Sequence, residues 1–407
     1  MPPGSSSAVE AAQEAIRRFN GRFRAFSHVV PDVGGEAAPG PLHGVPVSVK
    51  GCIPVAGLPW TEGSATHAGR IAQHDADIVA KVRAAGGVIM GTTTLSELAM
   101  YGVENPFEPM GLNPWDPART AGGSSTGAGV AAALGMARIN IGTDSGGSIR
   151  NPACHCGVVG FMPSRGALTL EGQPLHVPSL TTVGLIAPTV TDVELAWEAL
   201  AERRPETPSL KMLVPWRLVR EMSDAETLSL FETAIAGLDV VEGEIPGWME
   251  GERAAGVVSL AECGRALAGM DLSKASDGIR ARAANAARLL AQDVEAARTA
   301  CAKLKANLRD IVVTPTWPFA APPIHAQSVE LGGRQVPVDP HRNCFVRAAN
   351  AADACAITIP MGLYPTAQVP AGLHLTAPAG SERQLLALAR TLEARMPKLP
   401  LPPPRRE

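Results

Sequence analysis

The order of its expected elements predicts that the chain folds as an α/β protein with one large domain over residues 1–407. Segments of strand-like pattern alternate along the chain with segments of helical pattern, which is typical of α/β architecture. We find no internal repeat with a period of about 20 to 50 residues, and no linker polar enough to mark a domain boundary. A chain of 407 residues is long enough to bury one large core.

Local patterns predict the individual elements. The sequence "GVPVSVKG" at 44–51 alternates β-branched apolar residues with others, as a strand does. Further strands are expected at 88–91, 138–143, 310–315 and 354–360. Helices are expected at 8–19, 75–87, 126–137 and 278–309, and sequences of capping-box form at 191–194, 223–226 and 381–384 open others. The chain ends, 1–7 and the Pro-rich 397–407, are expected to be disordered.

Composition limits the function classes. Hydrophobic residues make up 45% of the chain and charged residues 18%, with a formal net charge of −3. This balance is that of a soluble globular protein and shows no basic surface for nucleic acid or an anionic membrane. No apolar run is long enough to span a bilayer, and the N-terminus lacks the apolar segment of a secretory signal. Seven cysteines in so long a chain suggest reduced thiols, so we expect a cytoplasmic protein.

Lys50 is the first candidate for chemistry, because "HGVPVSVKGCIPVAG" places it between apolar residues. Burial lowers the pKa of a lysine, since its charged form loses solvation, and a neutral amine is a competent general base. The plainer alternative is a lysine at a strand end whose ammonium reaches water.

The second candidate is "AGGSSTGAG" at 121–129, in which glycines and two serines precede a helix. Helix N-termini present unpaired N–H groups, so a serine there can serve simply as an N-cap. The phosphate-binding motifs that would make this a phosphate cradle are missing. The run 123–127 matches G-x-S-x-G, but the Pro-broken loop before it does not fit the strand that a nucleophile elbow requires.

The third candidate is the loop in "GTDSGGSIRNPACHCG" at 142–157. The pair Gly146 and Gly147 permits backbone conformations closed to other residues. The N–H groups from Ser145 to Ser148 could then converge on one oxygen and form an oxyanion hole. Asp144 and Arg150 flank the loop, and we expect them to support its shape rather than to touch a substrate.

Lys50, Ser124 and Ser148, in their order and in the segments "GGSS" and "GTDSGGSIR", resemble the amidase signature family. Similar segments run through most of the chain: 40–64, 92–106, 156–166, 178–197, 312–324 and 369–393. The resemblance covers about 8–195 and 305–395, whereas the helical part 200–300 diverges. It implies one domain with a central mixed sheet covered by helices. Departures at Gly51, Thr126 and Met162 leave the substrate open.

The resemblance implies an amidohydrolase that cleaves the C–N bond of a small amide through an acyl-enzyme. Ser148 would be the nucleophile, Ser124 would carry a proton to and from Lys50, and the peptide bond before Ser124 would be cis. Ammonia or an amine is released, and water then frees the carboxylate. No cofactor is implied.

Supporting roles follow from the same resemblance. The oxyanion hole would use Ser145, Gly146 and Gly147. Structural support would come from Gly123, Ser125, Asp144 and Arg150, and Leu98 would line the substrate pocket. Tyr101 and His155 are further candidates for substrate contact, and a plain packing role for His155 stays open.

Several alternatives stay open. The run Cys154-His155-Cys156 suggests a metal, but on an extended chain neighbouring side chains point to opposite faces, and no second ligand cluster exists, so we expect no metal site. The chain could instead be one polypeptide of an amidase that needs a partner chain for transamidation, or an inactive scaffold. A homodimer is compatible with the resemblance, and the identity of the small-molecule substrate is not fixed by the sequence.

Overall fold

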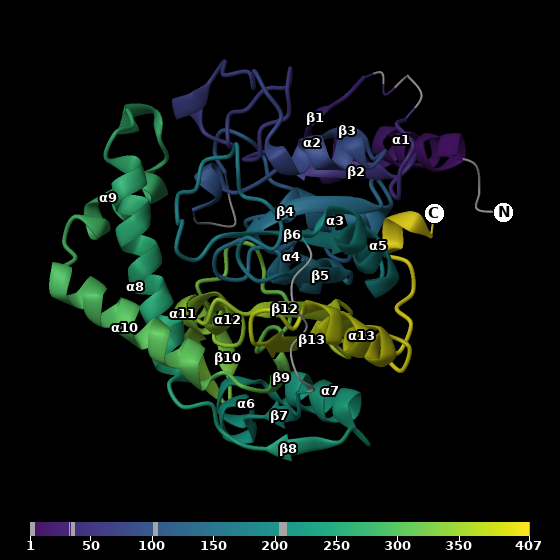
Figure 1. The fold of residues 1–407 in the computed structure, drawn as a ribbon. Coiled ribbons are helices and arrows are strands. Elements are labelled where there is room, and N and C mark those ends of the chain that lie inside the picture. The colour runs from purple at the N-terminus through teal and green to yellow at the C-terminus, as the bar shows by residue number, and fades with distance from the viewer. Residues whose placement is uncertain (1–4, 32, 34–36, 101–104, 203–209, 407) are drawn as a thin grey trace.

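An eleven-stranded mixed sheet runs through the computed structural model, which describes residues 5–31, 33, 37–100, 105–202 and 210–406 (Figure 1). Its strands, in spatial order, are β1 (Phe26–Val29), β3 (Val88–Thr93), β2 (Pro46–Lys50), β4 (Ile139–Asp144), β6 (Thr182–Ala187), β5 (Val159–Met162), β12 (Cys355–Leu363), β13 (Pro370–Ala377), β9 (Ile311–Pro315), β7 (Met212–Val214) and β8 (Val240–Glu242). The predicted α/β class with a central mixed sheet is confirmed.

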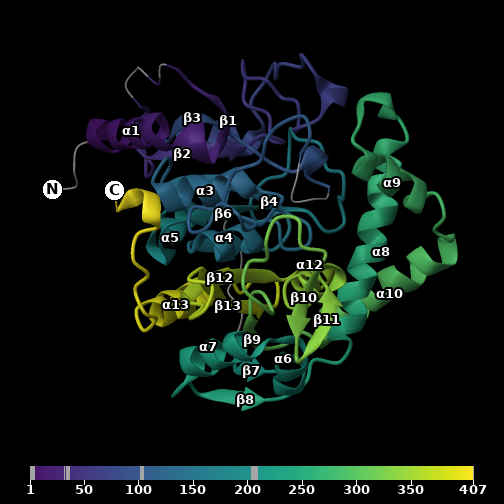
Figure 2. The same ribbon diagram turned by 180° about the vertical axis from the view of Figure 1, so that it is seen from behind.

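Helices cover this sheet and build one side of the molecule. They are α1 (Ser5–Phe23), α2 (Asp77–Ala84), α3 (Thr126–Leu134), α4 (Arg150–Cys156), α5 (Val190–Leu200), α6 (Trp216–Met222), α7 (Ala225–Ile235), α8 (Trp248–Leu267), α9 (Asp277–Ala286), α10 (Ala291–Asn307), α11 (Val338–His341), α12 (Arg347–Ala351) and α13 (Glu382–Glu393). Helices α8, α9 and α10 stand together at one flank in both views (Figures 1 and 2). A separate hairpin pairs β10 (Ser328–Leu331) with β11 (Arg334–Pro337).

The strands that position the candidate residues lie inside the sheet. Strand β2 pairs in parallel with both β3 and β4, and β4 pairs antiparallel with β6. Every residue of β2 and of β4 is buried. Strands that are covered on both faces consist almost entirely of apolar residues. A lysine at the end of the buried strand β2 is therefore unusual.

Helix α3 is buried along its whole length, and its small residues allow that. A Cβ atom at Gly127 would lie 2.1 Å from the carbonyl oxygen of Ala25, and one at Gly129 would lie 2.8 Å from that of Pro152. The Ala- and Gly-rich sequence thus lets α3 pack directly on backbone, and this fixes the loop that leads into it.

Several sequence expectations are wrong in detail. Residues 154–156 belong to helix α4 and are not extended. Pro152 does not prevent this helix, because it lies in the first turn, where no backbone N–H is needed. The helical region 278–309 is divided into α9 and α10, and the helical part 200–300 also supplies strands β7 and β8. The helix expected from a capping box at 191–194 begins two residues earlier than that box implies, at Val190 with Thr189 as its N-cap.

The disorder expected at both ends stays a prediction, and the structure describes part of each end. Helix α1 begins at Ser5, whereas residues 1–4 lie outside the described part. Residues 397–406 follow a defined path, in which Pro402 and Pro404 are buried and Arg405 donates to the carbonyl of Ala133. Within the residues that the structure describes, no helix has both the length and the apolar character needed to cross a membrane.

Candidate active site

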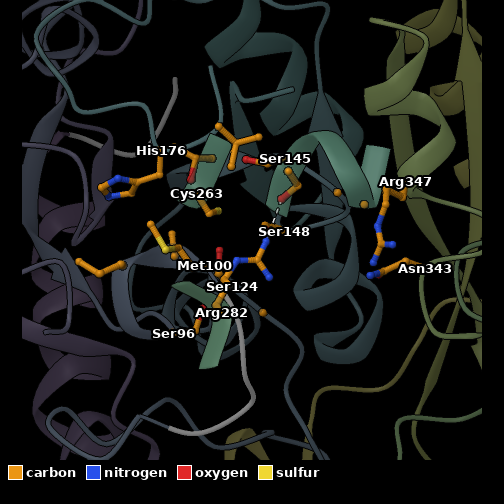
Figure 3. Close-up of a pocket in the computed structure, with 18 of the residues that line it drawn as sticks. Ser96, Met100, Ser124, Ser145, Ser148, His176, Cys263, Arg282, Asn343 and Arg347 are labelled. Atoms are coloured by element: carbon orange, nitrogen blue, oxygen red, sulfur yellow. Dashed lines mark hydrogen bonds between the residues drawn. The ribbon is translucent and has the colours of Figure 1, made fainter. Parts of the chain in front are cut away.

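Ser124 and Ser148 line one cavity of about 610 Å³ (Figure 3). The loops before α3 and α4 form part of its wall, and the segment 174–181 forms another part. Other lining residues come from α8, α9 and the segment 339–347, which runs from within α11 to the first residue of α12. The cavity is of a size that suits a small molecule.

Lys50 is fully buried at the carboxyl end of β2 and contacts Ser124 directly. Its Nζ lies 2.7 Å from Ser124 Oγ, 2.9 Å from Thr143 Oγ1 and 3.4 Å from the carbonyl oxygen of Thr143. Burial lowers the pKa of Lys50, and the nearby Cys52 and Asp144 oppose that shift. The lysine is therefore not the solvent-reaching strand-end residue of the plainer alternative.

The loop that carries Ser124 has an unusual backbone. The peptide bond between Gly123 and Ser124 is cis, as the resemblance implies. Ser125 is buried, and its Oγ donates to the carbonyl of Thr143 at 3.2 Å. Its N–H donates to the carbonyl of Ser148 at 3.2 Å, so the two serine-bearing loops are joined by a backbone hydrogen bond.

Asp144 and Arg150 form a fully buried ion pair behind the Ser148 loop and do not line the cavity. The Arg150 guanidinium contacts both carboxylate oxygens of Asp144, at 3.0 and 3.1 Å. It also donates to the carbonyl of Val346 and to Asn350 Oδ1, each at 2.6 Å. Arg150 thus ties the loop to α12, in agreement with a supporting role.

Two of the three expected oxyanion-hole donors are already engaged. The N–H groups of Gly146 and Gly147 donate to Asp144 Oδ1, at 3.1 and 2.7 Å, and that of Ile149 donates to Oδ2 at 3.0 Å. The oxyanion hole expected from Ser145, Gly146 and Gly147 stays a prediction, in which the last two N–H groups would have to share their hydrogens between Asp144 and the oxyanion. A carboxylate is a strong acceptor, and it holds the loop in one conformation.

These contacts also set the charge state of Asp144. Burial alone raises the pKa of a carboxyl group, but the Arg150 charge and hydrogen bonds from Arg150, Gly147 and Ile149 outweigh it. They hold the pKa of Asp144 well below its usual range, so this residue is an anion and is not a proton donor.

The expected substrate contacts have three different outcomes. Leu98 lines the cavity, as predicted, whereas Tyr101 lies outside the described residues. His155 is not among the residues that line the cavity: its ring packs edge-on against Trp317, with centroids 4.2 Å apart, and Trp317 stands at the cavity wall, which fits the packing role that the sequence left open. Burial lowers the pKa of His155 to about 3.

Sequence reasoning missed the wall that the divergent part contributes. The cavity-lining residues on α8 are Gly256, Ser259, Leu260 and Cys263, and those on α9 are Gly278, Ala281, Arg282 and Asn285. Each set repeats at three- and four-residue spacing, which is one face of a helix. That spacing was a usable signal, but the sequence does not tell which face of α9 meets a cavity. The segment 339–347 adds Asp339, Arg342, Asn343 and Arg347.

The described residues hold no group of three or more His, Cys, Asp and Glu side chains placed to bind a metal ion. Cys154 and Cys156 are buried, and burial raises the pKa of both thiols, that of Cys154 to about 12. Such thiols are poor metal ligands and poor nucleophiles at neutral pH.

Comparison with known protein families finds a match that contains the buried lysine and both serine loops. The sequence model of the Amidase family matches residues 24–236, which is more than half of the chain. The chain belongs to the amidase family. The family's matched region contains Lys50, Ser124 and Ser148, and it ends before α8 and α9 begin.

Individual relatives in the amidase family cover the chain to different extents. A glutamyl-tRNA(Gln) amidotransferase subunit from Chloroflexus aurantiacus is 36% identical over 221 residues, or 50% of this chain, and the match spans only 45% of that relative. The corresponding protein from Thermobifida fusca is 29% identical over 474 residues, covering 96% of this chain and 93% of the relative. A crystal structure described as an amidase superposes with a TM-score of 0.89 at 27% identity, over 97% of each chain.

Proposed function

We propose that the chain is a single-domain amidohydrolase that cleaves the C–N bond of a small amide with Ser148, Ser124 and Lys50. The observation that carries the proposal is the 2.7 Å contact between Lys50 Nζ and Ser124 Oγ at the wall of the cavity that Ser148 also lines. Burying a lysine ammonium without a partner costs folding free energy. Burial also favours the neutral amine, which is the form that accepts a proton in a relay. Membership of the amidase family supports a C–N hydrolase.

The first half of the reaction moves one proton along this line. Ser148 Oγ attacks the amide carbonyl and gives its proton to Ser124 Oγ, while the Ser124 hydroxyl proton passes to the neutral amine of Lys50. The lowered pKa of Lys50 favours the neutral amine that this step needs. Thr143 Oγ1 and its carbonyl oxygen accept the amine hydrogens and leave the lone pair for Ser124.

The second half returns the proton. The tetrahedral intermediate collapses, the C–N bond breaks, and the leaving nitrogen takes the proton back from Lys50 through Ser124. Water then attacks the acyl-enzyme by the same relay and frees the carboxylate and Ser148. The N–H groups of the 145–148 loop would receive the oxyanion, and those of Gly146 and Gly147 would share it with Asp144.

Ammonia release tests this proposal. The wild type and Ser148→Ala are given a panel of small primary amides, ureido acids and aryl amides, and labelling of Ser148 by a fluorophosphonate is measured in parallel. We expect release from one class of amide, abolished in Ser148→Ala, and labelling only in the wild type. A wild type that is neither active nor labelled would contradict the proposal and favour an inactive scaffold.

A second candidate is a polypeptide that works only with a partner chain. It is favoured by the names of the relatives, which are subunits of an amidotransferase. This candidate predicts a Ser148 that is labelled but releases no ammonia until a second polypeptide is added. Copurification from the native source, followed by mass determination of the complex, separates the two candidates.

A further inference from the structure

The charged groups of the cavity wall are mostly cationic. Arg282, Arg342 and Arg347 line the cavity together with a single carboxylate, that of Asp339. Another titratable side chain of the wall, His176, is turned to Glu62, whose Oε2 lies 2.7 Å from its Nε2. Figure 3 shows Arg282 near the centre of the close-up, with Arg347 and Asn343 together at one side.

Two of the three arginines are neutralised by a carboxylate. Arg347 Nη1 lies 3.0 Å from Glu252 Oε1, and Arg342 forms an ion pair with Asp339. The side chain of Arg347 also packs at the Ser148 loop, where a Cβ on Gly146 would lie 3.5 Å from its Cγ and Nε. These two arginines therefore have structural roles that account for their presence.

Arg282 has no such partner. Its Nη2 donates to Ser259 Oγ at 3.0 Å, and in the described part of the chain no carboxylate forms an ion pair with it. Its Nε is buried and has no hydrogen-bond partner among those residues. Ser259 on α8 and Arg282 on α9 both line the cavity, so their hydrogen bond holds the guanidinium at the cavity wall.

The three arginines of the cavity wall also influence one another through their charges. After burial, which is the largest cause, the charges of Arg342 and Arg282 both lower the pKa of Arg347, while those of Glu252 and Asp339 raise it. The three arginines are thus close enough to interact, and Arg282 is the one whose charge Asp339 and Glu252 leave unpaired. Asn343 accepts from Asn151 Nδ2 through its Oδ1 at 3.0 Å, which leaves its own Nδ2 donors for another acceptor.

We propose that Arg282 anchors a carboxylate of the substrate, so that this enzyme prefers small amides carrying a carboxylate over neutral amides of the same size. The inference rests on the proposed function of Ser148 in the same cavity. A planar guanidinium matches a carboxylate with two parallel N–H donors, which an ammonium or an amide cannot do. An anionic substrate would supply the counter-charge that the described residues do not give to Arg282.

The matched pair of malonamate and malonamide tests the preference, because the two differ only in a carboxylate against an amide. We expect the ratio of their kcat/KM values to favour malonamate in the wild type and to fall by about 10- to 100-fold in Arg282→Gln. Arg282→Lys should recover part of the preference, since it restores the charge without the fork. Arg288→Gln is the control: it removes the same charge at an exposed position just beyond α9 that does not line the cavity, and it should keep the wild-type ratio.

A binding measurement keeps the inference testable without turnover. Malonate is titrated calorimetrically into the wild type, Arg282→Gln and Arg288→Gln, with circular dichroism to show that each variant is folded. Saturable binding that is lost only in Arg282→Gln and weakens with added salt supports the anchor. Absence of binding to the wild type, or equal binding to Arg282→Gln, would overturn it.

The two proposals fail in different ways. If the amidase proposal is wrong, Ser148 is not labelled by the fluorophosphonate and neither amide is hydrolysed, yet malonate binding still reports on Arg282. If only the anchor is wrong, both amides are hydrolysed with a ratio that Arg282→Gln leaves unchanged.

Discussion

Lys50 has no solvent exposure, and its Nζ lies within hydrogen-bond distance of a serine hydroxyl that can exchange a proton with it and of Thr143 oxygens that can accept its hydrogens. Because burial lowers its pKa, and because a general base must be deprotonated, kcat/KM should rise with pH through that lowered pKa. A pH–rate profile on any amide that is hydrolysed checks this. Lys50→Ala should lower kcat/KM by about 10²- to 10⁴-fold and remove the rise. A profile that falls steadily from about pH 6 to pH 9 in a stable enzyme would contradict the role of Lys50.

His155 makes a different prediction at the same scale. In the unfolded chain a histidine binds a proton with a pKa of about 6.5, whereas burial lowers the pKa of His155 in the fold to about 3. Between these values the unfolded state holds more protons, so the free energy of unfolding rises with pH. This stability is fully present above about pH 6.5 and declines as the pH falls toward 3.

Replacing His155 by Phe should therefore flatten that dependence. The loss of one titrating proton reduces the slope by at most about 1.4 kcal/mol per pH unit. Urea unfolding at pH 5 and pH 7.5 measures it, and the edge-on contact with Trp317 is kept by the new ring. An identical slope in wild type and variant would show that His155 has the same pKa in the folded and unfolded states, and would contradict the lowered pKa. The buried His374, whose pKa is also lowered, remains in both proteins as a common background.

Among the elements, helix α3 depends on glycine at positions where a methyl group cannot fit. Gly127→Ala should destabilise the protein by about 1–3 kcal/mol, because the new Cβ would lie 2.1 Å from the backbone oxygen of Ala25. Gly21→Ala on α1 is the matched control: nothing lies within 4 Å of its Cβ position, so it should stabilise by about 0.5–1 kcal/mol. Chemical denaturation gives the free energy of unfolding of both variants. If both substitutions changed it in the same direction, the packing argument would be refuted.

The elements that the sequence predicts well are those with a long, strong pattern. Strands β2, β3, β4, β9 and β12 lie where alternation or a buried apolar run indicated them. Strands β7 and β8 have three residues each, too few for any period to be detected. Helix α4 has seven residues and includes a proline, so its sequence does not show that the Asp144–Arg150 pair and the packing on β5 and β12 hold it in place.

At the scale of the whole molecule, prediction of the site stops where it depends on distant packing. Lys50 and the two serines lie in short motifs, and the sequence suffices to propose them. Arg282 enters the cavity only because α9 packs on α8 and on a small cluster that includes Leu98 and Ile279. The engagement of Gly146 and Gly147 by Asp144 is likewise a matter of loop conformation, which composition does not determine.

The C-terminal segment offers a test of stability at this scale. Leu399 packs at Gly157, where a Cβ would lie 3.1 Å from its Cδ1, and Arg405 donates at 3.4 Å to Ala133 in the last turn of α3. A cation at the C-terminal end of a helix is favourable. Removing residues 398–407 should therefore destabilise the protein by about 1–3 kcal/mol, seen as a lower Tm in circular dichroism. Arg405→Ala alone should cost less, about 0.3–1 kcal/mol. A truncated chain that melts with the wild type would show that this segment contributes nothing.

The separate origin of the cavity's two sides has a consequence for how such a protein can change over generations. The residues of the proposed proton relay lie on β2 and on the loops before α3 and α4, whereas the wall with Arg282 lies on helices that stand apart at one flank (Figure 1). Substitutions at the cavity-lining positions of α8 and α9 can thus change which substrate binds without altering Lys50, Ser124 or Ser148. Natural selection or a protein designer can therefore vary positions such as Ser259 and Arg282 to change specificity first, provided that Glu252 stays to pair with Arg347 at the Ser148 loop.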